Sequence, residues 1–213
     1  KGRVVMKKIL FQGDSVTDAG RDRENPSDVG TGYVNLIAAE LGYTVPQQFV
    51  IENRGIAGDR SLDMLARWNK DCLNLAPDYL SILIGVNDVW HGIACNNGIS
   101  ADRYKVFLRM MLDDVRKQLP NTKVIIMEPF ITHGTSTDRA WECFRSEIGK
   151  RIETVRMLAA EYNIGCVRLQ EAFERVAETV PAENWTLEGV HPTPAGSTVI
   201  KNAWLKLFNN GNF

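Results

Sequence analysis

The sequence predicts an α/β protein in which five parallel strands form one sheet with helices on both faces. Two observations carry this prediction. The chain contains short apolar runs bounded by turn residues, and these alternate with stretches in which apolar residues have helical spacing. The short runs, which predict the strands, are Lys8–Phe11, Phe49–Glu52, Tyr79–Ile84, Val124–Met127 and Cys166–Leu169. Because parallel strands need crossover connections, this alternation indicates a parallel sheet that helices cover on both sides.

Boundary signals mark the helices and strands in this alternation. Apolar residues recur at helical spacing from Tyr33 to Leu41 and from Phe107 to Leu119. The predicted boundary residues are the helix N-caps Ser61 and Ser100, the glycines that follow helices, Gly42 and Gly165, and the prolines ahead of strands, Pro77 and Pro120. The polar segment Gly20–Gly32 is a long loop of the kind that is often functional. No repeat or linker divides the chain, so we expect a single domain over residues 1–213.

The composition argues against nucleic-acid and membrane partners. The formal net charge is -1, and no basic run is present that would neutralise phosphates. No apolar run approaches membrane-spanning length, and Ile9-Leu10-Phe11, which follows the basic stretch Lys1–Lys8, is too short for a signal-peptide core. The four cysteines are scattered without a C-x-x-C pair, as expected of reduced thiols. We therefore expect a cytoplasmic protein with a neutral or weakly polar substrate.

Polar residues follow four of the five predicted strands. In a doubly wound sheet, ligands bind outside the carboxyl ends of the strands, so these residues are the first candidates for a site. The segments are Gly13-Asp14-Ser15, Asn53–Asp59, Gly85-Val86-Asn87-Asp88 and Glu128-Pro129-Phe130. The sequence therefore predicts a functional site at this rim of the sheet.

Three histidines are candidates for the base that a serine nucleophile needs. A serine hydroxyl is a poor nucleophile until a base takes its proton, and histidine has a suitable pKa near neutral pH. The candidates are His91, His133 and His191. We favour His191, because Thr193 as N-cap and Pro194 as first helical residue would begin the last helix directly after it. This makes His191 the predicted base for Ser15.

Glu188 is the candidate for the third member of this site. It precedes His191 by three residues and could accept the second ring N–H, which would fix the tautomer of the imidazole. The structural alternative is a surface glutamate and a histidine that packs a loop beside two prolines.

Ester hydrolysis also needs hydrogen-bond donors for the oxyanion that forms in the reaction. Three donors are available at the rim: the backbone N–H of Ser15, the backbone N–H of Gly58 and the side-chain amide of Asn87. The ordinary alternatives are a turn at Gly58 and a loop cap at Asn87-Asp88.

Together these segments resemble the four sequence blocks of the SGNH (GDSL-like) hydrolase family. The matching order is Gly13-Asp14-Ser15, then Gly58, then Gly85-x-Asn87-Asp88, then His191-Pro192, and it spans nearly the whole chain. The resemblance implies a flavodoxin-like three-layer sandwich and a Ser-His-Asp mechanism without metal or other cofactor. It also implies an oxyanion hole formed by Ser15, Gly58 and Asn87.

This sequence departs from the family at the acid. The family has an aspartate three residues before the catalytic histidine, whereas this chain has Glu188. Glutamate is longer by one methylene and fills this position in some other hydrolases. We therefore expect Glu188 to be the acid.

Longer strings resemble the bacterial xylan acetylesterase branch of the family. They are Gly13–Arg21, Asn53–Gly58, Ala66-Arg67-Trp68 and Ser81–Trp90. This resemblance implies an intracellular homo-oligomer that removes acetyl groups from xylo-oligosaccharides.

Four further residues are candidate substrate contacts. Trp90 follows the Asn87 segment and Trp185 precedes Glu188, so either indole could stack on a sugar ring, with burial in the core as the alternative. Arg60 could hydrogen-bond a polar substrate or form a solvated ion pair with Asp59. Asp14, beside the predicted nucleophile, is the fourth candidate, with loop structure as its alternative role.

Three other functions compete with the acetylesterase hypothesis. A thioesterase or lysophospholipase of the same family would act on longer acyl chains, but no apolar lid is evident near the rim. A non-catalytic carbohydrate-binding or nucleotide-binding module would use Gly13-Asp14-Ser15 only as an anion cradle, yet no glycine-rich phosphate motif is present. A metal-dependent esterase would need clustered ligands, and the histidines are scattered.

Overall fold

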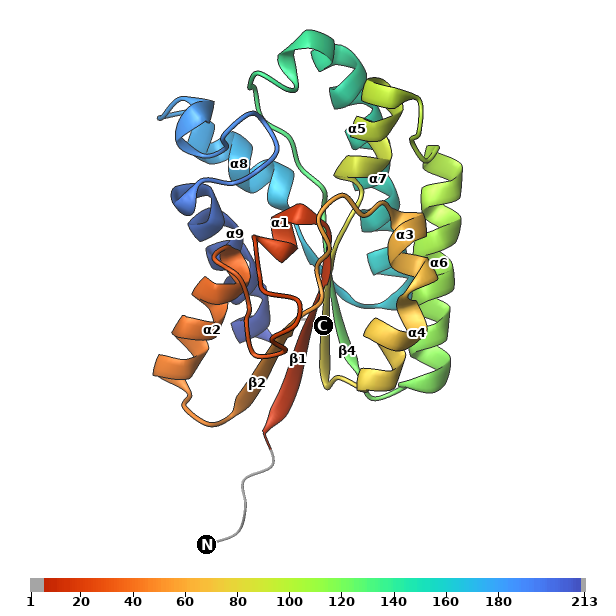
Figure 1. The fold of residues 1–213 in the computed structure, drawn as a ribbon, viewed down its shortest axis with the longest axis vertical. Coiled ribbons are helices and arrows are strands. Elements are labelled where there is room, and N and C mark those ends of the chain that lie inside the picture. Colours follow the sequence, from red (N-terminus) through yellow and green to blue (C-terminus); the bar gives the residue numbers. More distant parts are fainter. Residues whose placement is uncertain (1–5, 212–213) are drawn as a thin grey trace, which may run out of the picture.

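The computed structural model describes residues 6–211, and its core is one five-stranded, all-parallel sheet (Figure 1). The strand order is β2-β1-β3-β4-β5, so β1 lies between β2 and β3. The strands are β1 (Lys7–Gly13), β2 (Phe49–Asn53), β3 (Tyr79–Leu83), β4 (Lys123–Met127) and β5 (Gly165–Val167). The predicted α/β class with a parallel sheet is confirmed. Most of the basic stretch 1–8 lies outside the described residues.

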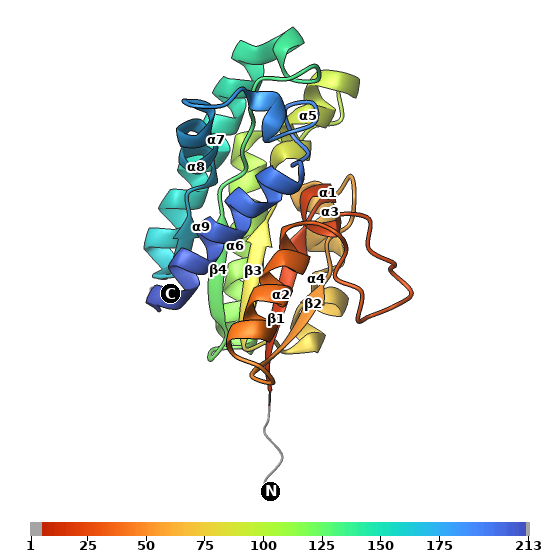
Figure 2. The same cartoon turned by 90° about the vertical axis from the view of Figure 1, so that its left-hand side faces the viewer.

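Helices cover both faces of the sheet and make a three-layer sandwich (Figures 1 and 2). One face carries α2 (Tyr33–Thr44), α8 (Leu169–Ala177) and α9 (Pro194–Asn210). The other carries α3 (Ser61–Ala66), α4 (Trp68–Asp71), α6 (Ala101–Gln118) and α7 (Trp141–Tyr162). The short helix α1 (Ser15–Asp18) and helix α5 (Val86–Cys95) begin at the carboxyl ends of β1 and β3, and the 3-10 turns are η1 (Leu73–Leu75), η2 (Asp138–Ala140) and η3 (Ala182–Asn184).

The strands have apolar residues on both faces because both faces are buried. In β1, Leu10 packs with the α3, α4, α6 and α7 layer, whereas Ile9 and Phe11 pack with the α2, α8 and α9 layer. Trp204 of α9 lies against Phe11 and donates through Nε1 to Ser81 Oγ of β3 at 3.0 Å. The contact between α2 and α9, elements from opposite ends of the chain, supports our proposal that the chain is one domain.

Two predicted caps are confirmed. The Ser100 hydroxyl accepts from Arg103 N at the start of α6, and the Thr193 hydroxyl accepts from Gly196 N at the start of α9, where Pro194 is the first helical residue.

Three other boundary predictions are wrong or displaced. Ser61 does not cap α3, because its hydroxyl donates to Asp88, and the Asp63 carboxylate accepts the Arg60 N–H at that helix start instead. Gly42 lies inside α2. Helix α7 ends at the left-handed residue Asn163, so Gly165 begins β5.

The fifth strand and the third rim segment also differ from the prediction. Leu169 begins α8 rather than ending a strand, because the apolar side chains of that amphipathic helix continue the pattern of β5. Asn87 and His91 lie on α5 rather than on a loop, since Gly85, with φ 133°, turns the chain directly from β3 into a helix.

No helix within residues 6–211 is both long and apolar enough to cross a membrane. All four cysteines are free thiols in the structure.

Candidate active site

Ser15 lies where β1 ends, at the first residue of α1. Asp14 caps this helix: its carboxylate is buried and accepts the Val16 N–H at 3.0 Å. Burial raises the pKa of Asp14 to about 7. Because this side chain is only 1% exposed, it has the structural role in the Ser15 turn rather than a free surface for substrate.

The structure brings Ser15, His191 and Glu188 into one chain of hydrogen bonds. Ser15 Oγ lies 2.8 Å from His191 Nε2, and His191 Nδ1 lies 2.6 Å from Glu188 Oε1. The same carboxylate oxygen accepts the backbone N–H of His191 at 3.0 Å. With the Nδ1 proton directed to the carboxylate, Nε2 is left to accept from the serine hydroxyl. Hydroxyl, imidazole and carboxylate in this order form the arrangement that activates a serine for nucleophilic attack.

The loop that carries His191 is held by short-range backbone contacts and by a distant segment, from which Thr132 N donates to Gly189 O at 2.9 Å and Ser136 N donates to Glu188 O at 3.0 Å. Thr186 and Pro192 form an antiparallel bridge, and Leu187 N donates to His191 O at 2.8 Å. Gly189, with φ 106°, turns the chain between the acid and the base, and a Cβ there would meet Thr137 Oγ1 at 2.4 Å. The loop therefore presents Glu188 and His191 on one side of a tight turn.

The other two histidines are held by other partners or lie on another element. His133 Nδ1 pairs with Asp138 at 2.7 Å, and its ring stacks on Trp141 at a centroid distance of 3.8 Å. His91 lies on α5. Of the three histidines, only His191 has a hydrogen bond to Ser15 within the described chain.

The three predicted oxyanion donors come from three adjoining segments of the rim. Within residues 6–211, neither Ser15 N–H nor Gly58 N–H donates to a protein acceptor. Gly58 has φ 88°, a conformation that favours glycine. The amide of Asn87 on α5 donates to Asp59 O at 3.0 Å with one hydrogen and retains a second. Donors that are fixed but unpaired are what an oxyanion site needs.

The predicted substrate contacts fall into two groups. The indole of Trp90 on α5 lies beside the base, with its ring centroid 5.9 Å from that of His191. Trp185, in contrast, donates to Val180 O at 3.1 Å and packs on the core beneath α9. Arg60 pairs with Asp63 at 2.8 Å rather than with Asp59, so its charge is already compensated.

A small apolar cavity lies beside the Ser15 turn. Its volume is about 10 Å³, room for about one water-sized group. It is lined by Asp14, Val16, Leu83, Ile84, Val86, Pro129, Phe130 and Val190. Across residues 6–211 we find no group of three or more histidine, cysteine, aspartate or glutamate side chains that could hold a metal ion.

Sequence reasoning missed the role of Asp59 and Arg67. The sequence suggested Arg60 as the partner of Asp59, yet Asp59 Oδ2 accepts from Arg67 Nε at 2.7 Å. The string Ala66-Arg67-Trp68 was notable only as part of a resemblance. No local pattern marks an arginine whose partners lie on other segments of the rim.

Comparisons with known proteins agree on one family. A sequence profile of the GDSL-like Lipase/Acylhydrolase family matches residues 11–199. The chain is 31% identical over 209 residues to an acetylxylan esterase of Geobacillus stearothermophilus, which covers 94% of this chain and 93% of that protein. A predicted GDSL-like lipase of Parabacteroides merdae has a crystal structure that is similar with a TM-score of 0.91 and 34% identity, covering 98% of this chain and 99% of the other. The crystal structure of the Geobacillus esterase Axe2 is similar with a TM-score of 0.85 and 31% identity, over 94% and 93% of the two chains.

Proposed function

Because the chain belongs to the GDSL-like lipase/acylhydrolase family and is a carboxylic ester hydrolase, we propose that it removes short acyl groups, above all acetyl, from carbohydrates such as xylo-oligosaccharides. The hydrogen-bonded chain from Ser15 through His191 to Glu188 is the observation that carries the proposal. The acetylxylan esterase from Geobacillus supports the choice of substrate.

In the proposed mechanism, Ser15 Oγ attacks the ester carbonyl while His191 Nε2 takes its proton. Glu188 then faces an imidazolium at Nδ1 and stabilises that charge at 2.6 Å. His191 returns the proton to the departing sugar oxygen, which leaves an acyl group on Ser15. A water that gives its proton to His191 releases the acid and restores the serine.

The negative charge on the carbonyl oxygen is stabilised by three donors in this proposal. They are the N–H groups of Ser15 and Gly58 and the free hydrogen of the Asn87 amide. Glu188 stands where the family has aspartate, and its carboxylate reaches both Nδ1 and the backbone N–H of His191.

Two features support a short acyl group on a carbohydrate. The cavity beside the Ser15 turn has room for only about one water-sized group, which disfavours a long acyl chain there. The Trp90 ring beside His191 is only partly buried and is suited to stack on a sugar. Trp185 is not part of this surface in our proposal, because its indole N–H is bound by Val180 O.

Initial rates on p-nitrophenyl acetate, butyrate and octanoate, together with acetate release from acetylated xylo-oligosaccharides, test the proposal. We expect turnover to fall steeply from acetate to octanoate, and the oligosaccharide to release acetate. Preference for octanoate would instead indicate a lysophospholipase or thioesterase activity. Loss of oligosaccharide turnover in Trp90→Ala, with p-nitrophenyl acetate turnover retained, would place the sugar beside that indole.

We further propose that the protein is a cytoplasmic homo-oligomer. Four free thiols are consistent with a reducing compartment. The assembly is proposed from the resemblance to the xylan acetylesterase branch. Light scattering during size-exclusion chromatography tests it, and a mass near 23.9 kDa would contradict it.

A further inference from the structure

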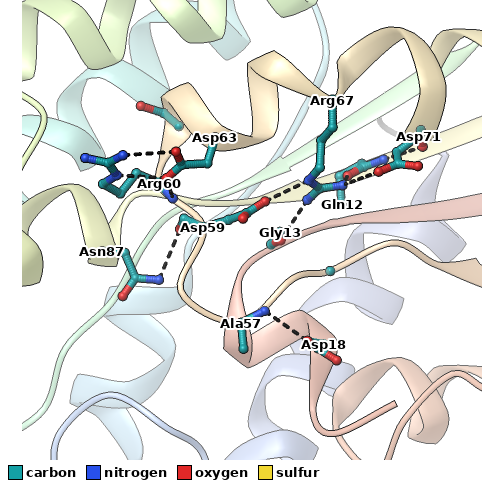
Figure 3. Close-up of polar contacts among 12 residues, drawn as sticks. Gln12, Gly13, Asp18, Ala57, Asp59, Arg60, Asp63, Arg67, Asp71 and Asn87 are labelled. Carbon is teal, nitrogen blue, oxygen red and sulfur yellow. Dashed lines mark hydrogen bonds and ion pairs between the residues drawn. The ribbon is translucent and has the colours of Figure 1, made fainter. Parts of the chain in front are cut away.

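One guanidinium joins the segments that carry the proposed oxyanion donors (Figure 3). Arg67, directly after α3, donates through Nε to Asp59 Oδ2 at 2.7 Å and through Nη2 to Gly13 O at 3.3 Å. Its Nη1 donates to Gln12 Oε1 at 2.8 Å and to Asp71 Oδ2 at 3.4 Å. The side chains of Arg67 and Asp59 are 13% and 12% exposed, so this ion pair is largely shielded from water.

Two of these contacts lie next to the donors themselves. Asp59 directly follows Gly58, and its backbone oxygen accepts the amide of Asn87 (Figure 3). Gly13 lies two residues before Ser15. Arg67 therefore connects the segments of all three donors, although it reaches none of the donors directly.

The Gly58 loop has other anchors on both sides of Gly58. Ala57 N donates to Asp18 Oδ2 at 2.9 Å, and Ile56 N donates to Gly13 O at 3.0 Å. Beyond Gly58, Asp59 N donates to Ile56 O at 3.1 Å and Ser61 N donates to Asp88 Oδ2 at 2.9 Å, so Arg67 is the contact that links this part of the loop to the β1 end. The Asp59 carboxylate is held by Arg67; burial raises the pKa of that carboxyl, and the hydrogen bond from Arg67 opposes this shift.

An oxyanion hole stabilises the transition state only when its donors are fixed before the charge develops. A charge-assisted, partly buried hydrogen bond fixes a loop better than a neutral one. We propose that Arg67 is a positioning residue for the oxyanion hole, an inference that rests on the proposed function. Its pairing with Asp59 sets the Gly58 N–H and the Asn87 amide against the Ser15 turn.

Two aspartates on the same guanidinium give a matched test. Asp59 links Arg67 to the donors, whereas Asp71 lies on α4 and links it to that helix. Asp59→Asn and Asp71→Asn therefore make the same chemical change, on side chains that are 12% and 17% exposed. The Asp59 contact is the shorter one, 2.7 Å against 3.4 Å, so kcat is compared with Tm in each variant: a purely structural role of Arg67 predicts that the loss of kcat follows the loss of Tm in both.

We expect Asp59→Asn and Arg67→Lys to lower kcat on p-nitrophenyl acetate by about 10-fold to 100-fold, with KM changed by less than about 3-fold. Asp71→Asn should stay within about 3-fold of the wild type. The ³¹P chemical shift of the adduct formed with diisopropyl fluorophosphate reports hydrogen bonding to the phosphoryl oxygen. It should move in Asp59→Asn and Arg67→Lys and stay unchanged in Asp71→Asn.

Equal losses of kcat in Asp59→Asn and Asp71→Asn, or an unchanged ³¹P shift in Arg67→Lys, would overturn the inference. The inference would also be overturned if the loss of kcat were proportional to the loss of Tm in all three variants. These results leave the proposed function intact, because they need a wild type that hydrolyses p-nitrophenyl acetate. A wild type that forms no adduct and releases no p-nitrophenol contradicts the proposed function and the inference together.

Discussion

The two halves of the candidate site are held by different kinds of contact. The half with the proposed base is a tight turn in which Glu188 binds His191 three residues later and the Thr186–Pro192 bridge closes the loop. The half with the nucleophile and the oxyanion donors is held by long-range partners, since Arg67 binds Gly13 and Gln12 more than fifty residues earlier in the chain. The contact between acid and base is local in sequence, although Thr132 N and Ser136 N also bind this loop, whereas the Arg67 contacts to Gly13 and Gln12 form only in the folded protein.

Loss of the Ser15 hydroxyl, which joins the two halves through its contact with His191, should lower kcat the most. Ser15→Ala removes the hydroxyl that His191 contacts at 2.8 Å, and we expect kcat to fall by about 10⁵-fold to 10⁶-fold. His191→Ala should cause a similar loss, and the double variant little more, because the two groups act as a unit. Esterase rates with circular dichroism as a check on folding measure this. Activity above about a tenth of wild type in Ser15→Ala would show that another residue is the nucleophile.

Within the local half, the charge of Glu188 should matter next. Glu188→Gln keeps the size of the side chain but removes the carboxylate that orients His191, and we expect kcat to fall by about 10³-fold to 10⁴-fold. Glu188→Asp keeps the charge and should lose less. If Glu188→Gln and Glu188→Asp are equally impaired, geometry rather than charge sets the contribution of this residue.

In the long-range half, Gly58→Ala should have a smaller but clear effect. A side chain at φ 88° strains the backbone and shifts the N–H, although open space surrounds the position. We expect kcat to fall by about 10²-fold to 10³-fold. Gly42→Ala, inside α2 and equally open, is the control and should leave kcat unchanged. Comparable kcat in the two variants would show that the Gly58 N–H does not contribute to the oxyanion hole.

The smallest expected effect is on the pH dependence of the unfolding free energy, and it arises from the buried side chain of Asp14. Its pKa is raised from 3.8 to about 7, so the folded protein binds more protons than the unfolded chain between these values. The stability of the wild type therefore falls as pH rises from about 4 to 7. Asp14→Asn keeps the cap but does not titrate.

The change in unfolding free energy caused by Asp14→Asn measures this effect. As pH rises from 5 to 8, the unfolding free energy of the variant should increase by about 1 to 3 kcal/mol relative to that of the wild type. Urea unfolding at each pH measures it. A difference between the two proteins that is independent of pH would contradict the raised pKa.

This contrast explains how much the sequence could predict. The strands were predictable because short apolar runs bounded by turn residues are typical of buried strands, and Glu188 and His191 because their contact spans three residues. Helix α5 was not predicted, since its buried residues Asn87 and Asp88 are polar and hydrogen-bond to backbone groups of Asp59 and Ser61. The link between Asp59 and Arg67 was missed because the two residues are 8 positions apart, on either side of α3, a separation that is not a neighbour spacing of a helix or a strand.

The central claim is that Ser15 is a nucleophile activated by His191. Incubation with a fluorophosphonate, followed by digestion and mass spectrometry, tests it most directly. We predict one adduct, on the peptide that contains Ser15, formed much more slowly in His191→Ala and absent from Ser15→Ala. An adduct on another residue, or an equal rate of labelling in the His191→Ala variant, would contradict the account.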